Sequence, residues 1–332
     1  MIKNTKPKIV VIGGGTGSFA ALTGLKKHPV DLSAIVSMMD SGGSSGRLRD
    51  ELGVLPPGDI RQCLVALATS SRLLRNLFSY RFEDGDLKGH NFGNVFLSTL
   101  EKTTGSMEKA ISEVGKILRI QGSVIPVTFQ KTDLCVELMN GKIIVGETHI
   151  DEVEKKVERA KIKRAFLKPL AQSNPAGLKA ITDADLILIG PGDLYTSIIP
   201  NLLVEGIADA IKKSGAQKVF VLNLMTKYGQ TTHYKATDHI EDLEKYLGKN
   251  ILTSVLVNSK SPTKKTLAWY KDFDEEPVID NLDELNRGFK NFRLDLLKNV
   301  LIGKSSSDSL KRSIIRHDPE KLASTIMSLF SQ

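Results

Sequence analysis

The sequence predicts an α/β fold, a Rossmann-like parallel sheet covered by helices on both faces, with a smaller C-terminal sub-lobe. Continuous apolar runs of strand length alternate with longer helical patterns, and strands buried on both faces carry such runs. Three glycine-rich segments follow predicted strands, where open parallel sheets bind ligands. We expect residues 1–332 to form a single ligand-binding domain.

The apolar runs predict strands at residues 8–13, 32–38, 123–129, 185–190, 218–224 and 251–257. Helical patterns occupy residues 59–69, 91–102, 106–118 and 202–213. A short antiparallel hairpin is predicted at 133–147, because Asn140-Gly141 is a strong two-residue turn signal between strand-like arms. Looser polar segments from about residue 226 to 312 predict the sub-lobe, which contains a strand-like run at 292–297. A closing helix is expected from Pro319.

Composition and charge exclude several classes of protein. Hydrophobic residues make up 41% and charged residues 25% of the chain, as in ordinary globular proteins. The formal net charge is +8, but Lys and Arg are spread along the chain, which favours small anionic ligands over nucleic acid. Two cysteines are too few for a disulfide framework, and no apolar run suits a membrane span or signal peptide. We therefore expect a cytoplasmic protein.

The first glycine-rich segment, GGGTGS at residues 13–18, follows the first strand and precedes a helix expected from about Phe19. Glycine lets the backbone pass close to a phosphate group. The candidate ligand contacts are Gly14, Gly15, Thr16 and Gly17. The segment also fits the dinucleotide pattern GxGxxA, with Asp40 placed as a ribose-binding acid. A tight turn that packs the helix on the sheet is the alternative.

The second segment, DSGGSSGRLRD at residues 40–50, closes the second strand. Its candidate ligand contacts are Asp40, Gly42 and Gly43. A pocket that binds adenosine does not need a second run of backbone amides and hydroxyls. The second segment therefore indicates that the ligand carries a second anionic group. Arg47 and Arg49 would supply positive charge or anchor the loop.

The third segment, GPGDLYTS at residues 190–197, follows the most apolar strand. Backbone amides, hydroxyls and a helix N-terminus would converge there on an anion. The candidate ligand contacts are Gly192, Tyr195, Thr196 and Ser197. Two such cradles facing each other would hold a diphosphate from both sides.

Two more segments open helices. In PPGDIRQ, residues 56–62, Asp59 is expected to cap a helix from Ile60 or to contact ligand. In GHNFGN, residues 89–94, Asn94 is a candidate ligand contact, and His90 is either an acid–base group or a structural residue.

Together, GGGTGS, DSGGSSGRLRDELGVLPPGDIRQCLVALA, GHNFGN, GETHI and GPGDLYTSIIPNLL resemble the YvcK family of gluconeogenesis factors over roughly residues 8–330. That family is related in fold to the 2-phospho-lactate transferases of deazaflavin coenzyme biosynthesis, so the resemblance implies a CofD-like fold. It also implies a cytoplasmic bacterial protein that binds uridine-diphosphate (UDP) sugars, notably UDP-N-acetylglucosamine. Family members support cell shape and envelope synthesis during growth on gluconeogenic carbon sources.

The resemblance assigns nucleotide-sugar binding to Tyr270 in LAWYKDF and to Arg316 in the RHDP motif. Tyr270 would stack on uracil and Arg316 would pair with a phosphate; a core tyrosine and a capping arginine are the alternatives. The chain departs from the family at Asp40-Ser41, where relatives commonly carry Asp-Asp or Asp-Asn. Paired acids at this place accompany a divalent metal in the transferases. Because Ser41 stands at the place of the second acid, Asp40 is the one expected Mg²⁺ contact of this pair. A single acid here disfavours transferase chemistry.

Three functions remain open at this stage. The first is a UDP-sugar-binding regulator with an unidentified partner protein, for which the basic run Lys155 to Lys168, expected as an exposed helix, is a candidate surface. The second is an Mg²⁺-dependent transferase acting on a nucleotide diphosphate donor. The third, a nicotinamide-dependent oxidoreductase, leaves the second glycine-rich segment without a role. A homodimer is the default expectation for a bacterial α/β protein.

Overall fold

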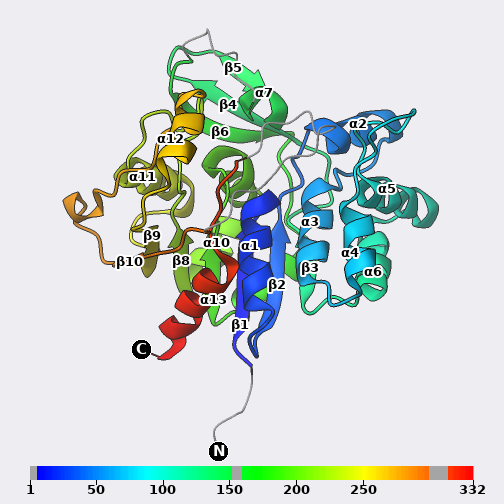
Figure 1. Ribbon diagram of the computed structural model, residues 1–332, viewed down its shortest axis with the longest axis horizontal. Coiled ribbons are helices and arrows are strands. Elements are labelled where there is room, and N and C mark those ends of the chain that lie inside the picture. The colour runs from blue at the N-terminus through cyan, green and yellow to red at the C-terminus, as the bar shows by residue number, and fades with distance from the viewer. Residues whose placement is uncertain (1–5, 152–158, 299–312, 332) are drawn as a thin grey trace, which may run out of the picture.

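The computed structural model describes residues 6–151, 159–298 and 313–331, and its main feature is a seven-stranded sheet (Figure 1). The strand order is β10-β9-β8-β7-β1-β2-β3, and all neighbours run parallel. The strands of this sheet are β1 (Lys8–Gly13), β2 (Asp31–Val36), β3 (Ser123–Pro126), β7 (Leu186–Ile189), β8 (Gln217–Val221), β9 (Ser254–Asn258) and β10 (Lys290–Leu294). The predicted parallel sheet and its strand runs are confirmed.

The strand order reverses between β1 and β7. Ile12 of β1 pairs with Ile35 of β2 on one side and with Ile189 of β7 on the other. The chain first builds outward from β1 to β3, and later from β7 to β10 in the opposite direction. At such a point the connections after adjacent strands diverge to opposite faces and leave a crevice. The glycine-rich segments after β1 and β7 therefore meet at one edge of the sheet.

Helices cover both faces of this sheet, as the long buried strands require. In Figure 1, α1, α3 and α13 stand side by side in front of the sheet. On the other side α10 packs against both α8 and α11. The helices are α1 (Gly15–Leu25), α2 (Gly43–Leu52), α3 (Gly58–Leu67), α4 (Arg72–Ser79), α5 (Phe92–Thr104), α6 (Met107–Leu118), α7 (Glu147–Asp151), α8 (Pro175–Thr182), α9 (Ile199–Leu202), α10 (Ile207–Lys213), α11 (Ala236–Leu247), α12 (Lys264–Lys271) and α13 (Pro319–Ser328), with short turns η1 (Leu194–Ile198), η2 (Leu282–Glu284) and η3 (Leu329–Ser331). No helix in the described ranges is long and apolar enough to cross a membrane.

A second, three-stranded antiparallel sheet lies above the carboxyl ends of the main strands (Figure 1). It consists of β4 (Asp133–Leu138), β5 (Ile143–Val145) and β6 (Ile162–Lys168) in the order β5-β4-β6. Asn140-Gly141 joins β4 to β5, with Gly141 at a φ of 84°, so the predicted hairpin is confirmed. Helix α7 follows β5 and faces the main sheet from above.

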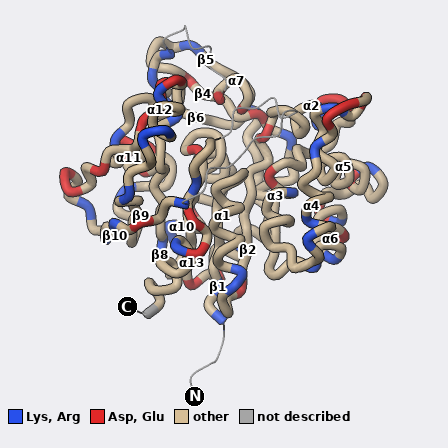
Figure 2. Tube along the Cα trace, in the orientation of Figure 1, with Lys and Arg blue, Asp and Glu red and all other residues tan. Residues whose placement is uncertain are grey.

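The exposed helix predicted at 155–168 is wrong over the part that the structure describes, because residues 162–168 form β6; residues 152–158 lie outside the described residues. The segment 226–312 supplies α11, β9, α12 and β10, and two of these are strands of the main sheet; residues 299–312 lie outside the described residues. Positively and negatively charged residues are both scattered over the trace (Figure 2).

The helices at the sheet edge begin earlier than their sequence pattern suggests. Helix α1 starts at Gly15 rather than near Phe19, and the second glycine-rich segment becomes the first turn of α2 at Gly43. Helix α3 starts at Gly58 with Pro57 as its N-cap, so the predicted capping role of Asp59 is wrong. As a result, several helix N-termini, which favour anions, converge on one region.

Candidate functional site

A cleft opens at the carboxyl edge of the main sheet, between the glycine-rich segments and the three-stranded sheet. Six stretches of chain form most of its wall: the starts of α1, α2 and α3, helix α7, and the segments after β7 and β8. The lining residues are Gly14, Gly15, Thr16, Gly17, Ala20, Asp40, Gly42, Ser44, Ser45, Gly58, Asp59, Arg61, Gln62, Arg81, Asn94, Glu147, Thr148, Asp151, Pro191, Gly192, Asp193, Thr196, Ser197, Asn223, Leu224, Met225, Thr226, Lys227, Tyr270, Glu275, Ser313, Ile315, Arg316 and His317.

The first and third glycine-rich segments touch each other. A Cβ atom on Gly17 would lie 2.0 Å from the carbonyl oxygen of Pro191 and 2.9 Å from the amide nitrogen of Gly192, so only glycine allows this approach. Asn223, two residues beyond β8, donates from Nδ2 to the carbonyl oxygen of Gly192 at 2.8 Å. The two predicted cradles therefore form one continuous wall of the cleft.

The second segment ties the main sheet to α7. The hydroxyl of Ser41 accepts a hydrogen bond from the amide of Thr148 at 3.0 Å and lies 3.0 Å from the Thr148 hydroxyl. Ser41, the residue after Asp40, is therefore a contact to α7. Arg47 donates to the carbonyl oxygen of Lys88, and Arg49 pairs with Asp133 at 3.1 Å, so both arginines anchor the segment.

Carboxylates gather beside the first and second glycine-rich segments. A Cβ on Gly58 would lie 2.5 Å from Asp40 Oδ2, and one on Gly14 would lie 2.2 Å from Asp59 Oδ2. Burial, together with the nearby Asp40, Asp151 and Asp59, raises the pKa of Glu147 well above its usual value. This side of the cleft thus carries strong negative charge, with one carboxyl biased toward its protonated form.

These carboxylates suit Mg²⁺ only in part. In the described portions of the chain, no group of three or more His, Cys, Asp and Glu side chains is arranged to hold a metal ion. Mg²⁺, however, commonly binds one or two carboxylates and takes its other ligands from water and substrate phosphates. Asp40 and Asp59 both line the cleft and would be the carboxylates that hold it, where it would neutralise phosphate charge.

Tyr270 and Arg316, assigned by resemblance, both line the cleft and belong to adjoining segments. The Tyr270 side chain is buried, and its hydroxyl accepts hydrogen bonds from the amides of Ile314 and Ile315 at 3.1 and 3.3 Å. Tyr270 therefore fixes the segment that carries Arg316. The next residue, His317, is buried, which lowers its pKa to about 4 and keeps it neutral.

The other predicted contacts divide into two groups. Gly14 to Gly17, Asp40, Gly42, Asn94, Gly192, Thr196 and Ser197 line the cleft, whereas Gly43 and Tyr195 do not. Tyr195 points into the core, fully buried, with its hydroxyl donating to Asp242, so we no longer expect it to touch a ligand. His90 is buried beside the Ser44 hydroxyl at 3.2 Å, which supports its structural role.

Sequence reasoning missed the charged residues that other segments bring to the cleft. Glu147, Asp151, Asp193 and Lys227 all line it. Asp193 lies within the third glycine-rich segment, Glu147 lies within the GETHI motif and Asp151 directly follows it, so those motifs are the available signal. Nothing in the local pattern around Lys227 marked it.

The fold and the cleft define a class: a Rossmann-like α/β protein with a ligand site at the switch point of its sheet. A protein-family model described as 2-phospho-L-lactate transferase CofD matches residues 9–297. The chain therefore belongs to the CofD family, and its resemblance to the gluconeogenesis-factor members is confirmed by the relatives described next.

Relatives match over nearly the whole chain. A Bacillus subtilis protein named gluconeogenesis factor is 39% identical over 328 residues, covering 98% of this chain and 99% of the relative. A Listeria innocua protein of the same name is 40% identical, with coverage of 99% and 97%. A crystal structure of a Bacillus halodurans protein superposes with a TM-score of 0.89 at 40% identity, covering 97% of this chain and 100% of that one.

Proposed function

We propose that this protein binds a UDP-sugar, with UDP-N-acetylglucosamine as the principal ligand, and that it acts as a regulator. The observation that carries the proposal is the contact of two glycine-rich segments, after β1 and β7, at the switch point of the sheet. A diphosphate placed there meets helix N-termini from both sides. In this proposal the bound UDP-sugar reports the supply of envelope precursors in the cytoplasm to a partner protein, which supports cell shape during gluconeogenic growth.

Thermal unfolding with and without ligand tests the proposal. A ligand present at about 100 times its dissociation constant stabilises the folded state by about 2.7 kcal/mol, which for a chain of this length raises the Tm by about 4 °C. UDP-N-acetylglucosamine should produce that shift without Mg²⁺, whereas GDP and NAD, compared in parallel, should not. Absence of any shift with millimolar UDP-sugars would exclude the proposed function.

A second candidate is an Mg²⁺-dependent transferase that uses a nucleotide diphosphate donor. The presence of Asp40 and Asp59 in the same cleft favours it, as does the description of the family model. It predicts stabilisation by GDP only with Mg²⁺, and product formation that the Asp40→Asn variant loses. Stabilisation by GDP with Mg²⁺ but not by UDP-sugars would shift the proposal to this candidate.

A further inference from the structure

Lys227 is a half-buried lysine in the wall of the cleft. It lies beyond the carboxyl end of β8, and its side chain is 17% exposed. Burial disfavours its charged form, but the carboxylates of Asp193, Asp151 and Glu275 outweigh that cost and raise the pKa of Lys227 above its usual value. The ammonium group is therefore charged under all physiological conditions.

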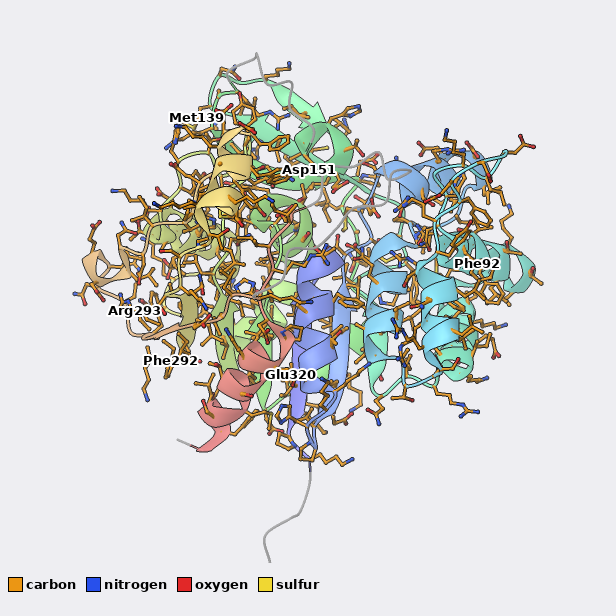
Figure 3. The ribbon with its side chains drawn as sticks, in the orientation of Figure 1. Phe92, Met139, Asp151, Phe292, Arg293 and Glu320 are labelled. Carbon is orange, nitrogen blue, oxygen red and sulfur yellow. The ribbon has the colours of Figure 1, made fainter. Side chains whose placement is uncertain are left out.

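Two carboxylates hold this ammonium from different sides of the cleft. Asp151 belongs to α7, below the three-stranded sheet (Figure 3). Its Oδ1 atom lies 3.0 Å from Lys227 Nζ, and Gln230 donates to the same oxygen at 2.9 Å. Asp193 Oδ2, in the third glycine-rich segment, lies farther away, at 3.9 Å. Asp151 is thus the close partner and Asp193 the distant one.

The carboxylate of Asp193 lies where it would repel an anion bound in the cleft. It lies between Gly192 and the turn Leu194–Ile198, and its side chain does not cap that turn. The first amides of the turn attract a phosphate group, whereas a carboxylate beside them repels it. Such a carboxylate is compatible with anion binding only if a neighbouring cation offsets it, and Lys227 is in that position.

We propose that Lys227 binds the anionic group of the ligand, and that Asp193 competes with the ligand for this lysine. The ligand class is a phosphate or diphosphate, so the inference rests on the proposed function and assigns its anion-binding cation. On binding, the longer contact to Asp193 gives way to the ligand, while the shorter contact to Asp151 keeps the ammonium in place. The two carboxylates then have opposite effects on affinity.

Isothermal titration of the full chain with UDP-N-acetylglucosamine, UDP and inorganic pyrophosphate tests this assignment. Lys227→Met removes a charge-assisted hydrogen bond and should weaken binding of all three by about tenfold or more. Asp193→Asn removes a like charge and the competitor, and should tighten binding by about threefold to tenfold. Lys227→Arg should retain most of the wild-type affinity.

A matched ion pair far from the cleft serves as the control. Lys179 and Asp183 lie 2.9 Å apart at the end of α8, before the amino end of β7, whereas the cleft is at the carboxyl ends of the strands. Lys179→Met and Asp183→Asn should leave all three affinities unchanged. This pair shows the effect of removing the same chemical groups without altering the cleft.

The outcomes separate the two proposals. If Lys227→Met binds as tightly as wild type, or if Asp193→Asn weakens binding, the assignment of Lys227 is overturned while UDP-sugar binding stands. If pyrophosphate binds and responds as expected but UDP-sugars do not bind, the proposed function fails and the assignment holds. Should Lys227→Met not fold, the direction of the Asp193→Asn effect decides.

Discussion

The turn that follows β7 packs into the core through Tyr195 and lines the cleft, and the Tyr195→Phe substitution separates these two roles. The Tyr195 ring is fully buried and its hydroxyl donates to Asp242 of α11, while the neighbouring residues Thr196 and Ser197 line the cleft. The Tyr234 hydroxyl donates to the same carboxylate oxygen at 2.7 Å. Asp242 therefore connects the cleft-forming turn to the core, and Tyr234 offers a matched variant that removes the same hydrogen bond elsewhere.

The size of the effect follows from this geometry. A hydrogen bond to a buried charged group contributes about 1.5–3 kcal/mol, and Asp242 keeps one tyrosine and Lys245 after either substitution. We expect each variant to lose about 2 kcal/mol of unfolding free energy, or about 3 °C in Tm. Tyr195→Phe alone should also weaken UDP-N-acetylglucosamine binding, by about threefold to tenfold, because only Tyr195 belongs to the turn.

Urea denaturation and calorimetric titration of both variants measure these quantities. Equal affinities for Tyr195→Phe, Tyr234→Phe and wild type would refute the idea that Asp242 positions the turn. Unchanged unfolding free energies in both variants would refute the assigned strength of the buried hydrogen bonds.

Two other substitutions carry definite expectations. In Gly17→Ala the new methyl group would lie 2.0 Å from the Pro191 carbonyl oxygen, and in Gly24→Ala 2.0 Å from that of Pro319, so each should cost about 1–3 kcal/mol of stability. Only Gly17→Ala should also abolish ligand binding in titrations; equal losses of affinity in both would contradict this. Burial holds the pKa of His317 at about 4, below its ordinary 6.5, so as pH falls the unfolded chain takes up this proton first. The contribution of neutral His317 to the free energy of unfolding is complete above pH 6.5, and about 3 kcal/mol of it is lost by pH 4. Urea denaturation of His317→Gln should therefore show a weaker pH dependence of the free energy of unfolding than wild type. An unchanged pH dependence would refute the lowered pKa of His317.

Elements with a strong local pattern were predicted closely. The run KIVVIG forms β1 with the predicted bounds Lys8–Gly13, and the hairpin at Asn140-Gly141 forms as expected. Each depends on a signal that neighbouring residues supply: continuous burial for the strand, and positive φ for the turn. The sequence pattern predicts later starts for α1 and α3 and no helix at α2, because the first turns of these helices contain glycines and few apolar residues.

The sequence predicts which backbone segments form the candidate site, but not which of their side chains face the cleft. The glycine-rich segments lie where the sequence placed them, but the direction of individual side chains did not follow from their motif. Tyr195 faces the core and Thr196 faces the cleft, although they are neighbours, because the chain turns helically there and successive side chains point in different directions. Ser41, expected only as a missing acid, bonds to Thr148, which lies far along the chain.

The sequence by itself determined the strand runs, the glycine-rich segments that follow them, and membership of the family, because each depends on local spacing or on long matching motifs. The tertiary structure alone decided which charges share the cleft. Asp40, Asp193 and Lys227 follow β2, β7 and β8, whose carboxyl ends lie at one edge of the parallel sheet, whereas Glu147 comes from α7, after β5 of the antiparallel sheet. The Lys227 ammonium lies 3.0 Å from Asp151 and 3.9 Å from Asp193, and these distances depend on how α7 packs against the turn after β7.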